Sequence, residues 1–227
     1  MSRFVISDIH GCSKTLKALV DRIGLTKLDS LYFLGDYIDK GIDSAGVVEF
    51  IMKLKNEGFL IETVRGNHEE NMLNAIQNYE PAFFQNYVIK ICKSSNLLDE
   101  NGLLIPKYFN FFNSLPYFIE LDDFWLVHAG FDTRNEFTFQ NRIAMLEIRG
   151  MIFDEQKLKG KTVVHGHQMT YLGDIQAAIK KRDKIIPLDN GCVKTKSNRY
   201  YDHHRLGNLC CLNLDTWELT IQKNIDI

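Results

Sequence analysis

Aspartate, histidine and asparagine residues follow three apolar segments in the first third of the chain. The segments "DIHG", "GDYIDKG" and "GNHEE" carry Asp8, Asp36 and Asn67, which lie 28 and 31 positions apart. Carboxylate, imidazole and amide groups are nitrogen and oxygen ligands suited to divalent transition metals. The pattern therefore indicates a metal centre, provided that the fold brings the three segments together.

Two later apolar segments also end in histidine. "FWLVHAG" carries His128, and "KTVVHGHQ" carries His165 and His167. A single histidine after a strand is usually structural, but here the histidines accompany the aspartates and the asparagine. The five cysteines include no C-x-x-C pair, so a disulfide framework, a structural zinc knuckle and thiolate ligation are not indicated.

The segments between the first three motifs alternate between strand and helix patterns. "RFVIS", "SLYFLG" and "LIETVRG" are short apolar runs typical of buried strands. One helix, with Ser13 as the expected N-cap and Gly24 as its stop, has apolar residues at 16, 19, 20 and 23. A second helix begins at about Asp43 and ends before Gly58. This order predicts right-handed crossovers and a parallel sheet.

The polar residues after these strands should converge, because parallel strands joined by helices all end at the same edge of their sheet. Each segment alone is equally consistent with a turn, since Asp, Asn and Gly favour turns and helix caps. Three consecutive strands that end in Asp, His or Asn favour a functional site over three unrelated turns.

Composition and charge limit the class of protein. The chain has 227 residues, 45% of them hydrophobic and 25% charged, and we expect one domain spanning 1–227. A formal charge of −2 provides no overall field for duplex nucleic acid, so no such partner is expected. The sequence shows no run of about eighteen apolar residues and no N-terminal secretory pattern, which favours a cytoplasmic protein without a membrane partner.

Five motifs, D-x-H-G, G-D-x-x-D-[R/K]-G, G-N-H-E, H-A-G and G-H-Q, occur in this order between residues 7 and 193. Together they resemble the calcineurin-like metallophosphoesterases of the phosphoprotein phosphatase superfamily, of the bacterial serine/threonine protein phosphatase type. The resemblance implies an α/β fold (α+β by some schemes) in which two mixed β-sheets pack as a sandwich flanked by helices. The later apolar segments can supply the second sheet: "YFIEL", "FWLVH", "TVVHG", "KIIPLDN", "NLCCLNL" and "WELTIQK". The last two, at about 207–223, are typical of a hairpin with a turn near Asp215.

The resemblance also implies two divalent metal ions. Manganese is the first expectation, and iron, zinc or nickel suit the same ligands. The implied ligands are Asp8 and His10 for the first ion, Asp36 for both, and Asn67, His128 and His167 for the second. His165 is interpreted as the last residue of its strand, because His167 is the histidine that precedes Gln168 in the matched motif.

Catalytic and phosphate-binding roles follow from the same resemblance. His68 would protonate the leaving oxygen and Asp39 would orient it, while a metal-bridging hydroxide attacks the phosphorus directly. Lys40, Arg149 and Asn67 would bind the phosphate. Lys40 stands where the family usually has arginine, and it offers a point charge instead of a two-pronged fork. Arg149 is almost equally consistent with a solvated helix arginine.

Three functions remain open from the sequence. The first is hydrolysis of phosphorylated proteins or peptides by a serine/threonine phosphatase. The second is symmetrical bis(5'-nucleosyl)-tetraphosphatase activity on a dinucleotide, whose usual enzymes are longer and carry Asp in place of Glu69. The third is a metal-binding module without catalysis, raised by Lys40.

Two regions lie outside the motifs. Residues 80–113 predict a helical insertion, broken near 94–102, that either caps the substrate cleft or packs on the sheet. Residues 194–207 form a basic and aromatic segment expected at the mouth of the site, where it would contact substrate or remain a solvated loop. His203 and His204 lie in this segment and are not counted as ligands.

Overall fold

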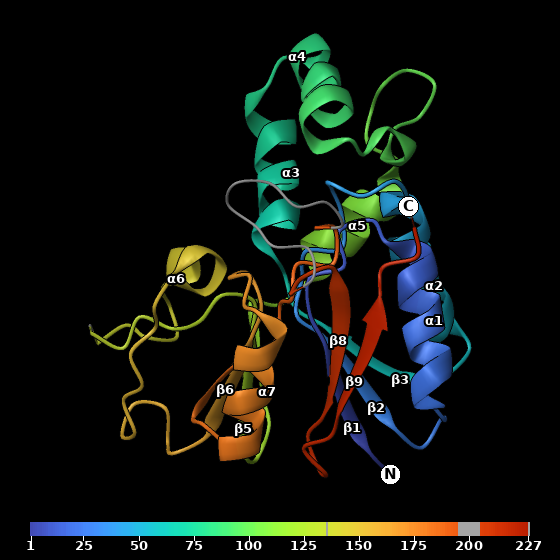
Figure 1. Cartoon of the computed structure of the whole chain (residues 1–227). Coiled ribbons are helices and arrows are strands. Elements are labelled where there is room, and N and C mark those ends of the chain that lie inside the picture. The colour runs from blue at the N-terminus through green and yellow to red at the C-terminus, as the bar shows by residue number, and fades with distance from the viewer. Residues whose placement is uncertain (135, 195–204, 227) are drawn as a thin grey trace.

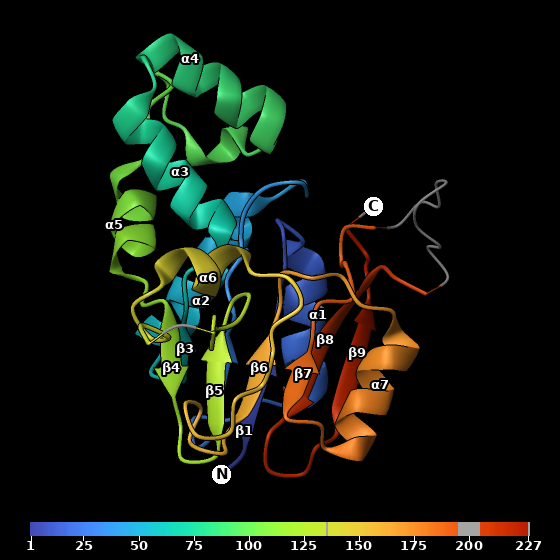
Figure 2. The same ribbon diagram turned by 90° about the vertical axis from the view of Figure 1, so that its left-hand side faces the viewer.

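The computed structural model describes residues 1–134, 136–194 and 205–226. In this part of the chain two β-sheets pack face to face and helices flank them (Figures 1 and 2). The strands are β1 (Arg3–Ile6), β2 (Ser30–Phe33), β3 (Leu60–Thr63), β4 (Phe118–Glu120), β5 (Phe124–Val127), β6 (Thr162–His165), β7 (Ile185–Pro187), β8 (Asn208–Asn213) and β9 (Leu219–Lys223). The helices are α1 (Ser13–Ile23), α2 (Ser44–Asn56), α3 (Asn67–Asn78), α4 (Pro81–Asn86), α5 (Pro106–Ser114), α6 (Arg142–Glu147) and α7 (Leu172–Lys181), with the π-helical turn η1 (Tyr87–Cys92) and the 3-10 turn η2 (Ser95–Leu97).

The first sheet has the strand order β3-β2-β1-β8-β9. Its strands β1, β2 and β3 are parallel and are joined through α1 and α2, which confirms the crossovers predicted from the sequence. The second sheet has the order β4-β5-β6-β7, with β5, β6 and β7 parallel. The two-sheet sandwich implied by the motifs is thereby confirmed.

The membership of the last two strands differs from the expectation. β8 and β9 form the expected antiparallel hairpin, but β8 pairs with β1 and so extends the first sheet, not the second. Both faces of β8 are buried, so its apolar pattern suits a central position in either sheet. Pairing with β1 places the chain that follows β7 close to the carboxyl end of β1.

The strands alternate their side chains between two buried layers. Val5 and Tyr32 of the first sheet and Leu126 of the second lie in the core between the sheets. Their neighbours Ile6 and Phe33 face the opposite way, toward the core under α1 and α2. Because both faces of the first sheet are covered, the sequences of its central strands are continuous apolar runs, as is usual for buried parallel strands.

The helix ends are close to those expected. Gly24 ends α1 in the left-handed conformation, at φ +62°, and the Asp43 side chain caps α2 by accepting from the Gly46 N–H. Ser13 is not the N-cap of α1: Cys12 holds that position, and the Ser13 hydroxyl donates to the Asp43 carboxylate at 2.6 Å. The N–H groups in the first turn of α1 donate instead to the side chain of Asp226.

Helices α3, α4 and α5 rise above the sheet edge at which β1, β2 and β3 end (Figures 1 and 2). The segment 80–113, expected to be a helical insertion broken near 94–102, contains α4, η1, η2 and most of α5, and residues 98–105 between η2 and α5 are not helical. In the described residues no helix is long and apolar enough to span a membrane.

We predict that Asp226→Ala destabilises the fold by about 1–2 kcal/mol, because its carboxylate caps the start of α1. Asp226 is buried and accepts from the N–H groups of Lys14 and Thr15 at 2.9 and 2.8 Å. Urea unfolding measures the change, with Asp183→Ala, an exposed aspartate after α7, as the matched control. Equal stability of the two variants would show that the cap contributes nothing.

Candidate metal centre

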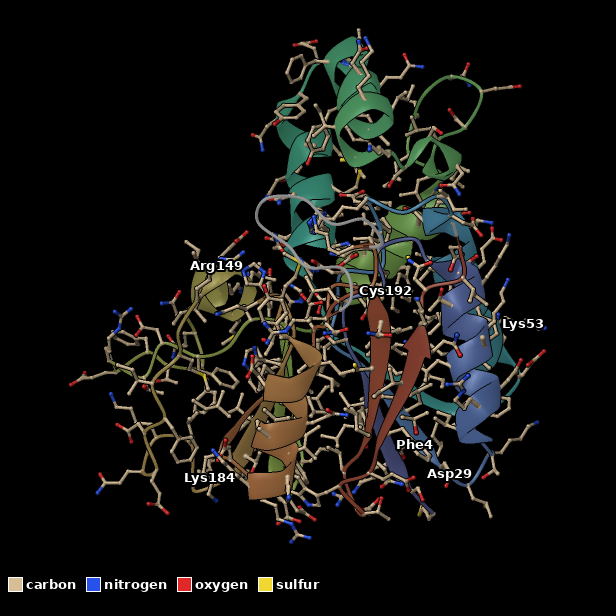
Figure 3. All side chains as sticks on the ribbon, in the orientation of Figure 1. Phe4, Asp29, Lys53, Arg149, Lys184 and Cys192 are labelled. Atoms are coloured by element: carbon tan, nitrogen blue, oxygen red, sulfur yellow. The ribbon has the colours of Figure 1, made fainter. Side chains whose placement is uncertain are left out.

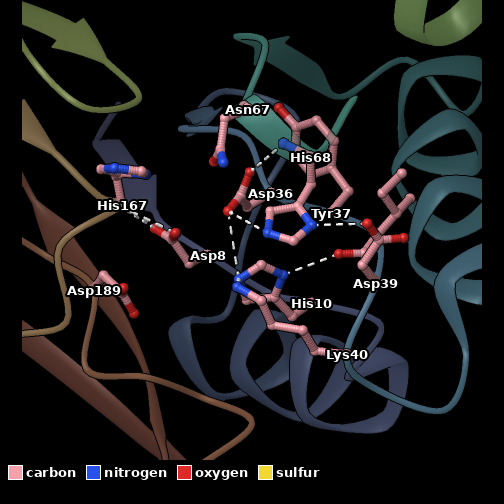
Figure 4. A network of polar contacts seen from close by, with 12 residues as sticks. Asp8, His10, Asp36, Tyr37, Asp39, Lys40, Asn67, His68, His167 and Asp189 are labelled. Carbon is pink, nitrogen blue, oxygen red and sulfur yellow. Dashed lines mark hydrogen bonds and ion pairs between the residues drawn. The ribbon is translucent and has the colours of Figure 1, made fainter. Parts of the chain in front are cut away.

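Six loops bring polar side chains to one edge of the sandwich, each from the end of a different strand (Figure 4). These side chains come from the ends of β1, β2, β3, β5, β6 and β7 and include Asp8, His10, Asp36, Asn67, His68, His128, His167 and Asp189. The convergence expected from the parallel strands is therefore present, and it extends to the second sheet.

Asp36 lies between histidines that approach its two oxygens from different sides. Its Oδ2 is 3.4 Å from His10 Nε2 and 3.8 Å from His68 Nε2, and its Oδ1 is 3.5 Å from His128 Nε2. Burial raises the pKa of Asp36, but the neighbouring histidines outweigh burial and hold this pKa below its usual range. A carboxylate in this position can contact two cations at once.

Two histidines are oriented by backbone carbonyls. His10 Nδ1 is 2.9 Å from the Ile38 carbonyl oxygen, and His128 Nδ1 is 2.9 Å from that of Leu34. Since a carbonyl can only accept, each Nδ1 carries a proton, and each Nε2 faces the Asp36 carboxylate. Burial lowers the pKa of His10 to about 4, so its ring is neutral and available as a ligand near neutral pH.

His167 provides a test of whether these residues fit a metal ion. Its Nε2 is buried and has no hydrogen-bond partner among the described residues, which is rare for a buried polar atom. Burial, assisted by the nearby His128 and Arg149, lowers the pKa of His167 to about 4. A neutral, buried nitrogen with no hydrogen-bond partner, 3.8 Å from the Glu147 carboxylate, is suited to coordinate a cation.

Asp8 lies beside His167 and completes the donor set. Its two carboxylate oxygens are each 3.1 Å from the His167 backbone N–H, and one accepts from the Ser7 hydroxyl. Potential ligand atoms lie within 4.8 Å of one another in two groups, His10–Asp36–His68 and Asp8–Asp36–His128. Asp36 belongs to both groups, and the grouping by distance pairs Asp8 with His128 and not with His10. Nitrogen and oxygen donors on both sides of Asp36 are suited to divalent cations.

His68 and Asp39 form a close pair beside these groups. The Nδ1 of His68 is 2.7 Å from Asp39 Oδ2, and His68 is only partly buried. Burial lowers the pKa of His68, but the charge of Asp36 and the hydrogen bond to Asp39 outweigh this effect and raise it above its usual value. An imidazole held in this way can donate a proton to a bound group.

The three residues expected to bind phosphate lie in different settings. Asn67 Oδ1 is 3.0 Å from His128 Nε2, so Asn67 lies among the candidate ligands. Lys40 is exposed, and its Nζ is 2.8 Å from His10 Nε2. Arg149 is exposed just beyond α6, near enough to lower the pKa of His167 (Figure 3). Thus Lys40 and Asn67 are at the centre, whereas Arg149 lies at its rim.

Two acidic residues belong to the site but were not assigned a role from the sequence. Glu69 is fully buried and accepts the N–H groups of Gly66, Asp36 and Tyr37 at 3.0, 2.9 and 2.8 Å. Burial and the charge of Asp36 raise its pKa to about 7. A glutamate three residues after an N-cap glycine is a capping-box signal that could have revealed this contact.

Asp189 is the second of these residues. It lies just after β7, so it follows the same strand-end rule as Asp8 and Asp36. Burial, followed by the charge of Asp8, raises the pKa of Asp189 well above its usual value, and its side chain accepts from the Gly191 N–H at 2.6 Å. Figure 4 shows it next to Asp8, on the side away from His68.

The loops that present the donors adopt unusual backbone conformations. Non-glycine residues in the left-handed region include His10 (φ +48°), Asp36 (+53°), Asp39 (+71°), Lys40 (+65°) and His167 (+63°). Such conformations persist only where surrounding contacts enforce them, and they are concentrated at functional sites. Gly66 is needed for a steric reason, since a Cβ there would collide with the backbone N and the carboxylate of Asp36.

The expected contribution of the segment 194–207 lies mostly outside the described residues. Only Lys194 and residues 205–207 are described, so the substrate contacts considered for this segment, and the setting of His203 and His204, remain sequence-based expectations.

The chain is thus a sandwich of two mixed sheets with nitrogen and oxygen side chains, suited to hold divalent metal ions, gathered at its strand ends. The family model described as calcineurin-like phosphoesterase matches residues 1–209. The chain belongs to this family.

Curated relatives resemble only part of the chain. A segment of 74 residues is 43% identical to a symmetrical bis(5'-nucleosyl)-tetraphosphatase of Wigglesworthia glossinidia brevipalpis, covering 32% of this chain and 26% of that protein. A segment of 88 residues is 33% identical to the enzyme of the same name in Buchnera aphidicola subsp. Schizaphis graminum, covering 38% and 31%. The chain thus matches less than a third of the length of either relative.

Solved structures share the fold over nearly the whole chain. A candidate diadenosine tetraphosphatase aligns with a TM-score of 0.66 at 20% identity, covering 97% of this chain and 92% of the other. A protein serine/threonine phosphatase from Saccharomyces cerevisiae, with similarity to human phosphatase PP5, aligns with a TM-score of 0.60 at 17% identity, covering 98% and 79%. These likenesses establish the fold.

We predict that Glu69→Ala weakens Mn²⁺ binding by about 10–100-fold, the range for partners that hold metal ligands in place. The variant should also lose at least about 2 kcal/mol of stability, because several buried N–H groups lose their acceptor. Calorimetric titration with Mn²⁺ and urea unfolding measure the two effects.

The control for this prediction is Glu70→Ala, on the same helix, which removes an ion pair with Arg65 instead. Equal Mn²⁺ affinity in the two variants would show that Glu69 does not hold the loop of Asp36 in place.

Proposed function

We propose that the protein is a phosphomonoesterase with two divalent metal ions that acts on phosphoserine and phosphothreonine in proteins or peptides. Asp8 and His10 would hold one ion, with Asp36 bridging to the second. Manganese is the metal proposed, and iron, zinc or nickel suit the same donors. When bound, the ions neutralise the phosphate oxygens and activate the attacking water.

The remaining ligands come from three loops. Asn67, His128 and His167 are proposed to hold the second ion, since each presents an oxygen or nitrogen toward Asp36 or lies beside a residue that does. Lys40, which lies beside His10, and Arg149, which is exposed at the rim, are proposed to bind and orient the phosphate. Asn67 adds an amide to the phosphate contacts.

The observation that carries this proposal is the pair formed by His68 and Asp39. A serine or threonine leaving group departs as an alkoxide, a strong base that needs a proton in the transition state. The protonated His68, fixed through Nδ1 by Asp39 at 2.7 Å, leaves Nε2 to donate that proton. A nucleoside diphosphate leaving group is a much weaker base and depends far less on such an acid.

A second candidate is symmetrical cleavage of a dinucleoside tetraphosphate, which the names of the curated relatives support. The segments matched are 74 and 88 residues long, whereas the loops of the metal centre extend from Asp8 to Asp189. Neither matched segment is long enough to contain all the loops of the candidate metal centre. These relatives therefore give weaker support for a particular substrate than the pair formed by His68 and Asp39 does.

We predict that Asp36→Asn lowers turnover of an aryl phosphate by more than about 100-fold, a larger loss than is usual for residues one step removed from a metal. The amide keeps the shape of the side chain but loses the charge that would bind both ions. Steady-state kinetics and metal content per chain measure the effect. Asp122→Asn, at an exposed loop beyond β4, is the control, and retained activity in Asp36→Asn would rule out a bridging role.

A substrate comparison tests the choice between the functions. Manganese-loaded protein is assayed on a phosphoserine peptide, on diadenosine tetraphosphate and on p-nitrophenyl phosphate, and we expect the highest kcat/KM on the peptide. His68→Asn should reduce turnover of the peptide by about 100-fold or more, because the alkoxide then lacks its proton donor. The aryl phosphate, whose leaving group is a weak base, should lose much less.

Preference for the dinucleotide by orders of magnitude would contradict the first proposal and favour the second. Absence of turnover on all three substrates, with metal bound, would favour a metal-binding module without catalysis.

A further inference from the structure

Ser94 reaches the metal centre from the helical insertion. It is fully buried between η1 and η2, and its hydroxyl donates to Asp39 Oδ1 at 2.7 Å. The other carboxylate oxygen of Asp39, Oδ2, is 2.7 Å from His68 Nδ1. One carboxylate therefore connects the insertion to the imidazole.

The protons of two serine hydroxyls can be assigned from the distances. Ser94 Oγ is 2.8 Å from Ser44 Oγ, and the Asp39 backbone N–H approaches the Ser44 and Ser94 oxygens at 2.9 and 3.1 Å. A hydroxyl has one proton, and the Ser94 proton is directed to Asp39 Oδ1, so Ser44 must donate to Ser94. The donors thus run in series, from Ser44 to Ser94 and from Ser94 to the Asp39 carboxylate.

The same segment of the insertion also holds the backbone near Asp39. Asp39 and Lys40 both have positive φ, and the Lys40 N–H donates to the Cys92 carbonyl at 3.0 Å. Such conformations cost on the order of 1–3 kcal/mol each and need contacts that enforce them. Residues 92 and 94 supply contacts of this kind to both residues.

An ordinary structural serine would satisfy its hydroxyl on a nearby carbonyl. The Cys92 carbonyl is available to Ser94, but at 3.5 Å, whereas the Asp39 carboxylate is at 2.7 Å. A hydrogen bond to an ionised carboxylate is shorter and stronger than one between neutral groups. The geometry therefore favours the carboxylate as the partner of Ser94.

We propose that Ser94 is a positioning residue for His68, acting through Asp39, and that the insertion is in this way part of the catalytic apparatus. This inference rests on the proposed function, because it takes His68 to be the proton donor. Without the Ser94 hydroxyl, the Asp39 carboxylate loses its donor at 2.7 Å on Oδ1 and is held less firmly about its Cβ–Cγ bond. His68 would then be oriented less well.

The test compares Ser94→Ala with Ser95→Ala, a neighbouring serine whose side chain is exposed. Both variants are assayed on aryl and alkyl phosphates whose leaving groups cover a range of basicity. For Ser94→Ala we expect kcat to fall by about 10–100-fold on the poorest leaving groups, with little change in KM and little loss on p-nitrophenyl phosphate. Ser95→Ala should match the wild type throughout.

Two further variants separate positioning from general damage. In an Asp39→Asn background, Ser94→Ala should cause no additional loss, because a residue that acts through Asp39 has nothing left to position. Ser94→Cys keeps a weaker donor and should give an intermediate loss. A loss that is equal for all leaving groups, or one that adds fully to that of Asp39→Asn, would overturn the proposal.

A structural comparison decides the matter without activity. Crystal structures of the wild type and Ser94→Ala should show a longer separation between Asp39 Oδ2 and His68 Nδ1 in the variant. An unchanged separation would overturn the positioning role. If the wild type hydrolyses none of the phosphates, the proposed function fails, while this comparison still confirms or overturns the link between Ser94 and His68.

Discussion

The geometry of the metal centre depends on one buried carboxylate, that of Glu69. It accepts N–H groups from Gly66 at the start of α3 and from Asp36 and Tyr37 after β2, so it fastens two strand-end loops to each other. One of these loops carries the carboxylate proposed to bridge the ions, and the other carries His68. Burying a carboxylate is costly unless it is hydrogen-bonded, and here several backbone donors offset the cost. The position of Asp36 relative to His68 is therefore fixed in part by hydrogen bonds from the backbone to Glu69.

A second constraint is electrostatic. Asp36 lies beside His10, whose pKa is about 4 because the ring is buried and whose Nδ1 proton is directed to a backbone carbonyl. The Nε2 atom of His10 faces the Asp36 carboxylate at 3.4 Å and Lys40 Nζ at 2.8 Å. His68 differs, because its Nδ1 faces the carboxylate of Asp39 and its pKa is raised. Environment thus separates the histidines into candidate ligands and a candidate acid, although their sequence settings after strands are similar.

The sequence predicted the parts of this arrangement that follow from local pattern. Asp8, Asp36 and Asn67 could be placed together because parallel strands joined by helices must end at one edge. The sheet that receives β8 and β9 could not be derived in this way, since their buried faces suit either sheet and pairing with β1 joins residues about 200 positions apart. The contact of Ser94 with Asp39 could not be predicted for the same reason. A serine in "KSSN" belongs to no local pattern that indicates a role, and Asp39 lies 55 positions away. Local physics predicts which residues stand at strand ends, whereas contacts between distant segments require the packed fold.

The separation of roles between the sandwich and the insertion has a consequence for substrate choice. The candidate metal ligands all come from strand ends of the two sheets, whereas the contacts that hold Asp39 and Lys40 come partly from residues 92 and 94 of the insertion. Ligand positions set how strongly phosphate charge is neutralised, a requirement common to all phosphoesters. The proton donor matters in proportion to the basicity of the leaving group. On the proposed function, changes in the insertion can therefore alter which leaving groups are accepted while the candidate metal ligands stay in place. The flexible Lys40 side chain lies beside His10 and so contacts the candidate ligands, while its backbone is held by the insertion.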